Sequence, residues 1–214
     1  MIRGFKGVIF DLDGTIIDSL GMWEAVDRVY LERFDHSLPG DLQRAIEGMS
    51  FHETALYFKE RFSLKDEVEV IKKDWHDLAW KYYENEVSTK EHVVDLLKSI
   101  KAMGIPMAIA TSNSRELATL ALKRNHLEEC FETVVTSGDV ARGKPAPDVF
   151  LEAARQIRVP PHQCLVFEDT FAGVLGAKAA GMTVYAVYEK YSEDFLEEIL
   201  KNSDGYIRHY KELL

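Results

Sequence analysis

Residues 7–15 read GVIFDLDGT, and this segment decides the fold class. Its first four residues form a short apolar run, which is typical of a strand buried on both faces of a parallel sheet. The run ends abruptly at Asp11, and a second carboxylate follows at Asp13. Because ligands of open α/β sheets bind beyond the carboxyl ends of the strands, we expect both aspartates at a functional edge.

Two carboxylates this close together are costly in a purely structural role. Asp11 and Asp13 repel each other unless a cation or a proton intervenes, and Gly14 lets the chain turn sharply beside a ligand. A solvated acidic turn is the alternative interpretation of an Asp-x-Asp pattern. The position directly after a buried strand favours the functional interpretation.

Further apolar runs resemble residues 7–10, and helical patterns lie between them. The runs occupy 106–110, 133–135, 164–167 and 183–187. Apolar residues spaced for one helical face occur within 93–100, 117–121 and 150–157. Strands that alternate with helices indicate βαβ units and an open parallel sheet. We therefore predict an α/β protein with a Rossmann-like parallel sheet as its core.

The segment from 18 to 87 breaks this alternation. It has no strand-like run, is rich in helix formers and aromatic residues, and carries turn signals at Pro39-Gly40 and Ser63. We predict a four-helix-bundle cap domain here, inserted after the first strand, so that 1–17 and 88–214 form the core. We expect the aromatic stripe to pack the cap helices, and a ligand cage is the alternative.

Composition limits the partners and the compartment. The formal net charge is −10, so no basic excess offsets the repulsion of nucleic acid or an anionic membrane. Neither Cys130 nor Cys164 lies in a metal-binding pattern, and we expect both to be reduced. No signal-peptide pattern begins the chain, and no apolar stretch approaches the roughly 18–20 residues that span a bilayer. We expect a cytoplasmic monomer.

Two motifs later in the chain carry groups suited to phosphate. Thr111-Ser112-Asn113 follows an apolar run and opens a helical pattern. A hydroxyl and free backbone N–H groups at a helix N-terminus form a phosphate cradle, although the same residue types are common helix caps. Residues 143–148 read GKPAPD, which places Lys144 in a loop stiffened by prolines. A lysine held in this way is a candidate fixed positive charge.

A third motif supplies ligands for a metal ion. Residues 166–170 read VFEDT, an apolar run that ends in Glu168 and Asp169. Together with Asp11, these carboxylates offer the hard oxygen ligands that Mg²⁺ requires. The sequence therefore predicts a Mg²⁺ site at the same edge of the sheet.

In order and spacing, these motifs resemble those of the haloacid dehalogenase (HAD) superfamily across nearly the whole chain. The helical insert is similar to the α-helical cap of the β-phosphoglucomutase and phosphoglycolate phosphatase subgroup. The resemblance implies a Mg²⁺-dependent phosphatase that hydrolyses a small phosphorylated metabolite through an aspartyl phosphate. Asp13 with the Glu168-Asp169 pair argues against dehalogenation.

The resemblance also implies roles for the motif residues. Asp11 is the nucleophile, and Asp13 is the general acid and base. Thr111 and the N–H of Ser112 bind the phosphoryl oxygens, and Lys144 bridges the nucleophile and the phosphate.

The implied metal ligands come from both ends of the chain. They are Asp11, the backbone carbonyl of Asp13, Glu168 and, more directly, Asp169.

The cap departs from the β-phosphoglucomutase pattern at the positions that would hold a second phosphate. Glu47 precedes Gly48 where a Lys is expected, and Phe51 replaces an Arg. Trp23 takes the place of a His on the first cap helix. A monophosphate hydrolase is therefore favoured over a phosphosugar mutase. A non-catalytic phospho-ligand binding protein is the second alternative, but every catalytic position carries the required residue type.

The remaining substrate-binding predictions concern the leaving group. Asn113 is expected to assist Ser112 in the phosphate loop. Trp23 and Glu47 are expected to face the site from the cap and to contact the leaving group. The alternatives are that Trp23 packs the cap and that Glu47 is solvated. The identity of the substrate stays open at this point.

Overall fold

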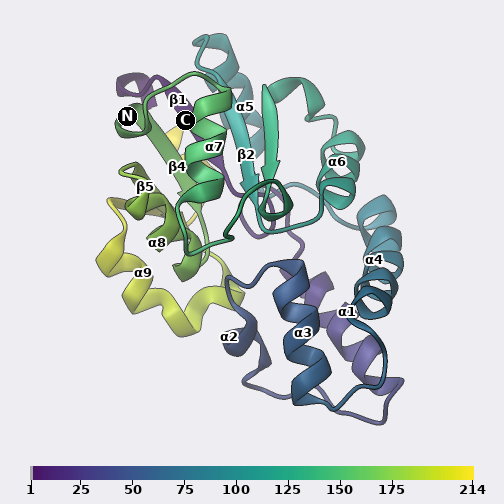
Figure 1. The fold of residues 1–214 in the computed structure, drawn as a ribbon. Helices are drawn as coiled ribbons and strands as arrows, with labels where there is room; N and C mark the ends of the chain where they lie inside the picture. The colour runs from purple at the N-terminus through teal and green to yellow at the C-terminus, as the bar shows by residue number, and fades with distance from the viewer. Residues whose placement is uncertain (1) are drawn as a thin grey trace.

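A computed structural model describes residues 2–214 of the chain (Figure 1). Its described residues form one sheet of six parallel strands in the order β3-β2-β1-β4-β5-β6. The strands are β1 Gly7–Phe10, β2 Met107–Thr111, β3 Thr133–Thr136, β4 Cys164–Glu168, β5 Thr183–Val187 and β6 Gly205–Ile207. The predicted Rossmann-like α/β core is confirmed. The sequence pattern missed β6, because three residues are too few to show a periodicity.

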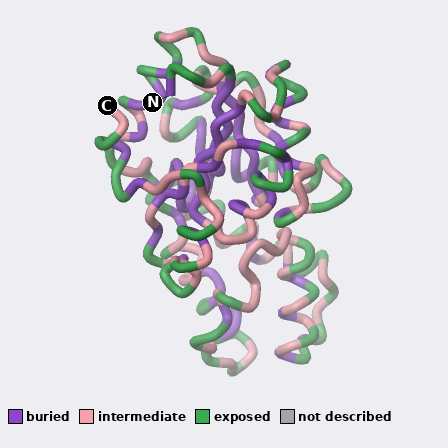
Figure 2. The backbone as a smooth tube through the Cα atoms, turned by 90° about the vertical axis from the view of Figure 1, so that its left-hand side faces the viewer, coloured by how far each residue is buried: buried purple, intermediate pink, exposed green. Residues whose placement is uncertain are grey.

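Helices cover both faces of the sheet. Val8 and Phe10 pack in one core with α5 (Val93–Ala102) and α6 (Arg115–Arg124). Ile9 points to the opposite face and packs with helices α7 to α9. These are α7 Asp148–Gln156, α8 Phe171–Ala179 and α9 Leu196–Asn202. Both faces of β1 are therefore buried, which explains its uninterrupted apolar sequence and the buried tube through the centre of Figure 2.

The order of the strands determines where a site can form. The chain runs outward from β1 through β2 to β3, then returns to the other side of β1 with β4. Ligands of such sheets bind at this reversal, outside the carboxyl ends of the strands. Phe10 is in register with Ile109 of β2 and Phe167 of β4. The residues that follow these three positions therefore meet at one edge.

The four predicted cap helices are present. They are α1 Leu20–Glu32, α2 Leu42–Ile46, α3 Phe51–Arg61 and α4 Val68–Asn85, seen below the sheet in Figure 1. Trp75 of α4 is buried, and its ring centroid lies 5.7 Å from that of Tyr30 and 4.6 Å from that of Phe58. The expected packing role of the aromatic stripe is correct for these rings.

Two chain crossings join the cap to the core, and they lie side by side. The Asp18 N–H donates to the Ser88 carbonyl at 2.9 Å, and the Lys90 N–H donates to the Ile16 carbonyl at 2.8 Å. The predicted boundaries at 17/18 and 87/88 lie beside this pairing, and the division into two domains stays a prediction.

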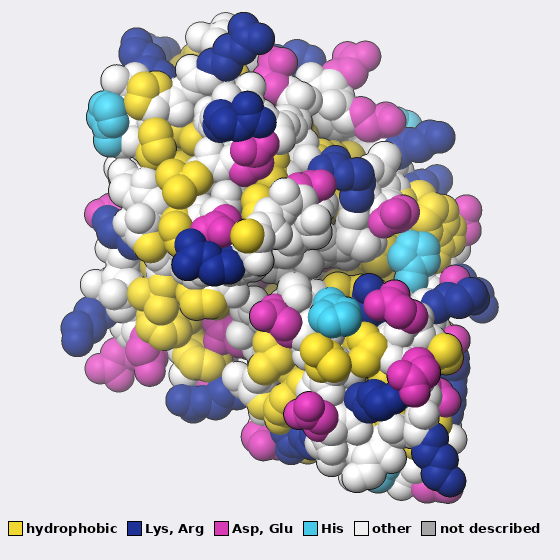
Figure 3. Space-filling model, viewed as in Figure 1, with side chains coloured by type: hydrophobic (Ala, Val, Ile, Leu, Met, Phe, Trp, Pro, Cys, Tyr) yellow, Lys and Arg dark blue, Asp and Glu magenta, His cyan; other side chains and the backbone are white. Residues whose placement is uncertain are grey.

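The surface carries charges of both signs. On the face shown in Figure 3, the described Lys and Arg side chains are interspersed with acidic ones and form no continuous basic patch. Cys130 and Cys164 are both free thiols. Within residues 2–214, no helix combines the length and the apolar character needed to cross a membrane.

Candidate active site

Lys144 joins two strand ends by a buried double contact. Its ammonium donates to Asp11 Oδ1 and to Glu168 Oε1, each at 2.5 Å. Asp11 directly follows β1, Glu168 ends β4, and all three side chains are almost fully buried. The structure thus places Lys144 beside Asp11, where the sequence predicted a fixed positive charge.

Burial and the neighbouring charges act in opposite directions on the pKa values of Asp11 and Lys144. Burial raises the pKa of Asp11 well above its usual range, although Lys144 acts in the other direction. Burial lowers the pKa of Lys144, but the Asp11 and Glu168 carboxylates outweigh that effect and raise it. The two carboxylates therefore favour the charged form of Lys144, and further positive charge near Asp11 would favour its ionised form.

Asp11, Glu168 and Asp169 form a buried acidic cluster whose carboxylate oxygens approach within 4.8 Å of one another. Both Glu168 oxygens already accept hydrogen bonds, Oε1 from Lys144 and Oε2 from the Asp169 N–H at 2.6 Å. Asp169 Oδ1 accepts from the Thr15 hydroxyl at 2.7 Å, but its buried Oδ2 has no partner among the described residues. A partnerless buried carboxylate oxygen in an excess of negative charge fits a hard divalent cation.

Glycine is required where the backbone passes this cluster. Gly14 has φ +82°, and a Cβ there would collide with the Asp169 carboxylate. The same holds for Gly173 of α8, where a Cβ would collide with the Glu168 carboxylate. The glycine of the DLDGT motif therefore makes the sharp turn that the sequence predicted, and the group that the backbone passes closely is the Asp169 carboxylate.

Asp13 is held by donors from both the cap and the core. Its Oδ1 accepts from Ser19 Oγ at 2.6 Å, from Trp23 Nε1 at 3.3 Å and from the Tyr83 hydroxyl. Its Oδ2 accepts from Asn113 Nδ2 at 2.9 Å. Ser19, Trp23 and Tyr83 all lie in the segment that forms the cap. The orientation of the predicted acid and base therefore depends on the position of the cap.

None of these four contacts with Asp13 was predicted. Asn113 and Trp23, predicted to contact substrate, donate to Asp13 and to the Tyr83 hydroxyl, and both also line the cavity. Tyr83 was not predicted, because nothing in the spacing at the end of α4 points to it. Ser19 could have been found as a hydroxyl six residues after Asp13, at the entry to the cap.

The residues predicted to bind phosphate, Thr111 to Asn113, lie at the end of β2. Thr111 is buried, and its Oγ1 accepts from the Asn113 N–H at 3.0 Å. Ser114, one residue beyond the predicted motif, is the side chain that caps α6, accepting from the Leu117 N–H at 3.2 Å. Thr111 and Ser112 both line the cavity and are free to face a phosphoryl group.

Glu47 forms a contact between the cap and the core. Its Oε1 accepts from the N–H groups of Phe171 and Ala172, at 2.6 and 3.3 Å, at the N-terminus of α8. Gly48, with φ +78°, packs against the Ala172 methyl so closely that a Cβ would collide. Glu47 lines the cavity as expected, but it is not a solvated side chain. One of its oxygens is committed to the core helix.

A cavity of about 210 Å³ lies at the junction of the cap and the core. One end is formed by the core residues Asp11, Asp13, Thr111, Ser112 and Lys144. The opposite walls come from cap residues, including Trp23, Asp27, Gln43, Phe51, Thr54 and Trp75. This combination of mostly apolar walls and a few polar groups is typical of a small-molecule site.

Asp27 is a polar residue of this cavity that the sequence interpretation missed. It lies one turn after Trp23 on α1, so both face the same way. Asp27 is 5% exposed, and its one hydrogen bond within the described chain comes from Gln43 Nε2 at 3.3 Å. Burial raises the pKa of Asp27 to about 7, despite that hydrogen bond. The i, i+4 spacing from Trp23 could have identified it.

Known proteins resemble this chain in sequence. Residues 8–187 match the model of the haloacid dehalogenase-like hydrolase family. A phosphorylated carbohydrates phosphatase of Thermotoga maritima is 31% identical, over 85% of each chain. Hexitol phosphatase A of Escherichia coli is 35% identical, over 85% of this chain and 82% of that protein. A bifunctional riboflavin kinase/FMN phosphatase of Arabidopsis thaliana is 34% identical over 84% of this chain. The matched region covers only 48% of the length of that protein.

Solved structures show the same architecture. A putative β-phosphoglucomutase from Thermotoga maritima superposes with a TM-score of 0.73 at 29% identity, covering 94% of each chain. A β-phosphoglucomutase from Clostridium difficile gives a TM-score of 0.84 at 19% identity, covering 98% of this chain and 93% of the other. At 19% identity, the comparison with the Clostridium difficile protein shows a shared fold alone.

The buried Asp27 carboxylate leads to a prediction about stability. The folded protein keeps Asp27 protonated up to about pH 7, whereas an unfolded aspartate ionises near pH 4, so burying it becomes costlier as the pH rises between these values. Asp27→Asn removes this cost. The variant's gain in free energy of unfolding should therefore increase by about 2–3 kcal/mol from pH 5 to pH 8. Urea unfolding of both proteins at the two pH values measures it, and a gain independent of pH would contradict the assignment.

Proposed function

Because the chain belongs to the haloacid dehalogenase-like hydrolase family, we propose that it is a phosphatase acting through an aspartyl phosphate on Asp11. The observation that carries the proposal is the buried contact of Lys144 with Asp11 and Glu168, beside the partnerless oxygen of Asp169. Relatives named as phosphatases of carbohydrates and hexitols support a small phosphorylated metabolite as the substrate.

In the first step, an Asp11 carboxylate oxygen forms a bond to the phosphorus. The bond between the phosphorus and the leaving oxygen breaks, and Asp13 gives that oxygen a proton. Lys144 lies 2.5 Å from Asp11 Oδ1 and lowers the repulsion between the carboxylate and the phosphate anion. Thr111 and Ser112, which line the same end of the cavity, bind the phosphoryl oxygens.

In the second step, water attacks the phosphorus and releases Asp11. Asp13 takes a proton from that water, and the bond between the phosphorus and the Asp11 oxygen breaks. The same side chain therefore acts as acid and then as base, which covalent capture in two steps allows. Its four hydrogen-bond donors hold the carboxylate over the cavity.

Asp11, the Asp13 carbonyl and Asp169 would hold Mg²⁺. Glu168 belongs to the same acidic cluster and fixes the loop by accepting from the Asp169 and Thr170 N–H groups. When bound, the ion would neutralise charge on the phosphoryl oxygens and on the attacking carboxylate, and it would offset the charge of the buried Asp169.

The cavity favours a hydrolase over a phosphosugar mutase. A mutase has to hold a second phosphate at the cap end of its substrate. Within residues 2–214, Lys144 is the only basic side chain that lines the cavity, and it belongs to the catalytic end. Glu47, in place of a basic residue, is bound to the N-terminus of α8. A second phosphate therefore has no positive partner there.

Removal of divalent metal should abolish hydrolysis of p-nitrophenyl phosphate. The buried acidic cluster carries three carboxylates against one lysine, so without a cation it repels a phosphate. Treatment with EDTA should reduce turnover to background, and excess Mg²⁺ should restore it. EDTA saturated with Mg²⁺ beforehand is the control. Undiminished turnover in metal-free buffer would refute the metal dependence.

Asp11→Asn should lower kcat by at least about a thousand-fold, because the amide is nearly isosteric but is not a nucleophile. Asp77→Asn, which removes an exposed carboxylate of α4 paired with Lys73, serves as the matched control and should keep wild-type turnover. Thermal unfolding should show that both variants fold. Turnover above a tenth of the wild-type rate in Asp11→Asn would rule out Asp11 as the nucleophile.

A further inference from the structure

The cavity extends from the catalytic residues toward the cap, and Asp27 lies on this extension. Trp23 Nε1 reaches Asp13, while Asp27 lines the cavity one helical turn further along α1. A turn of α-helix advances about 5.4 Å. A group bound at Asp27 would therefore lie several bonds beyond the leaving oxygen that Asp13 protonates. This is the position of the distal part of a leaving group.

Asp27 has too few partners for a structural carboxylate. It is 5% exposed, and one hydrogen bond of 3.3 Å from Gln43 is its sole polar contact with the described residues. Glu24 is a nearby acidic residue that raises the pKa of Asp27, and it pairs with Arg28. Buried carboxylates in proteins are normally paired or fully hydrogen-bonded. A ligand group in the cavity would supply the missing partners.

The neighbours of Asp27 identify the chemistry of that ligand. Gln43 of α2 brings an amide that both donates and accepts. Thr54 donates its hydroxyl proton to the Ser50 carbonyl at 3.1 Å, which leaves its oxygen free to accept. Trp23 and Phe51 add apolar faces, with ring centroids 5.9 Å apart. Hydroxyl groups, which donate and accept at the same carbon, match this mixture of partners.

Charged leaving groups match the subsite less well. An anionic group would meet Asp27 and Glu47, and no basic side chain of the described cavity lining stands at this end. A cationic group would pair with Asp27, but it only donates, and the Gln43 amide, which gives one N–H to Asp27, has a second N–H that no described residue accepts. A hydroxyl group can accept from that N–H and also donate to Asp27.

We propose that Asp27 and Gln43 form a subsite for adjacent hydroxyl groups of the leaving group, so that the substrate is the monophosphate of a polyol or a sugar. The proposal rests on the phosphatase function. It makes Asp27 and Gln43 the specificity-determining residues, together with Trp23, which forms part of the cavity wall.

The first test compares substrates of equal length. Sorbitol 6-phosphate, n-hexyl phosphate and 6-aminohexyl phosphate share a six-carbon chain and differ in the groups that would reach the subsite. At pH 8, above the pKa of Asp27, the kcat/KM for sorbitol 6-phosphate should exceed that for n-hexyl phosphate by at least about tenfold, the effect of one hydrogen bond to a charged group. Equal values for these two would overturn the proposal, and so would a preference for the ammonium compound.

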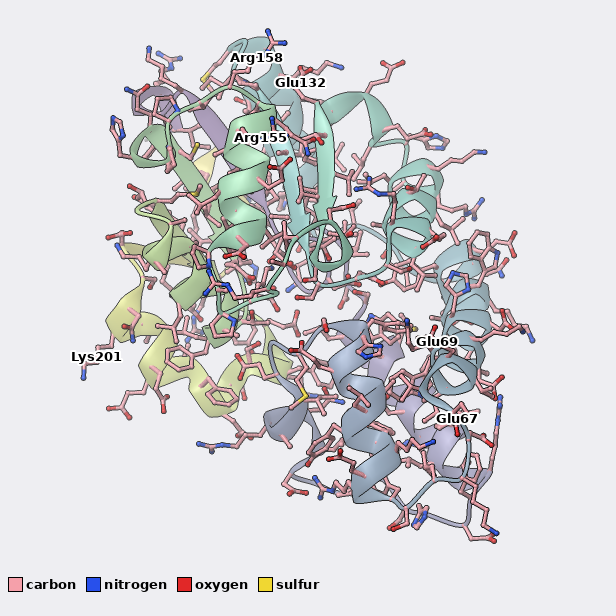
Figure 4. The ribbon with its side chains drawn as sticks, viewed as in Figure 1. Glu67, Glu69, Glu132, Arg155, Arg158 and Lys201 are labelled. Carbon is pink, nitrogen blue, oxygen red and sulfur yellow. The ribbon has the colours of Figure 1, made fainter. Side chains whose placement is uncertain are left out.

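The second test uses variants and reads the ratio of the two kcat/KM values. Asp27→Asn and Gln43→Leu should each lower the ratio of sorbitol 6-phosphate to n-hexyl phosphate by about tenfold. Glu67→Gln is the matched control, because Glu67 lies at the outer edge of the cap in Figure 4, with its side chain 84% exposed. An unchanged ratio in both cavity variants would overturn the proposal even if the wild type prefers the polyol.

A binding measurement separates this proposal from the phosphatase function. With Asp11→Asn protein and Mg²⁺, calorimetry should show tighter binding of sorbitol 6-phosphate than of n-hexyl phosphate, and Asp27→Asn in that background should remove the difference. If p-nitrophenyl phosphate is hydrolysed but the polyol is not preferred in binding or turnover, the subsite is wrong and the phosphatase stands. If no phosphomonoester is hydrolysed, the phosphatase proposal fails first.

Discussion

The structure depends on a buried excess of negative charge at the ends of β1 and β4. Asp11, Glu168 and Asp169 meet there, and among residues 2–214 Lys144 is the one cation in contact with them. Such a group persists only if the surrounding fold holds it in place and a ligand completes its charge. The chain provides the hold through buried strands, through the amides that Glu168 accepts, and through glycines that let the backbone pass beside the carboxylates. The buried carboxylates lower the stability of the fold, and they form a site that can bind a cation and a phosphate.

The cap makes the chemistry conditional on its own position. Asp13 belongs to the core segment, yet most of the donors that orient it come from Ser19, Trp23 and Tyr83. Burial raises the pKa of Tyr83 well above its usual range, so this hydroxyl keeps its proton and remains a donor. Glu47 ties the same cap to the first turn of α8. Under the proposed mechanism, withdrawal of the cap would open the cavity and also remove three of the donors that orient Asp13, which would link substrate admission to catalysis.

Sequence reasoning recovered the features that strong local constraints determine. The doubly buried β1, the motif residues at three strand ends and the four cap helices follow from periodicity and from the position of acidic residues after apolar runs. The partners of Asp13, the committed oxygen of Glu47 and the buried position of Asp27 did not follow in this way. They depend on how the cap sits against the core, and contacts between residues as distant as Asp13 and Tyr83 or Glu47 and Phe171 leave no short-range pattern.

The central claim is that Asp11 carries the phosphoryl group during turnover, and direct capture of that intermediate tests it best. Wild-type protein would react with a phosphomonoester labelled with ³²P and be quenched in acid within one turnover. Peptide mapping by mass spectrometry would then locate the label. The account predicts a hydroxylamine-labile label on the peptide that contains Asp11. An enzyme that turns over its substrate but shows the label on another residue, or none at any quench time, would contradict it.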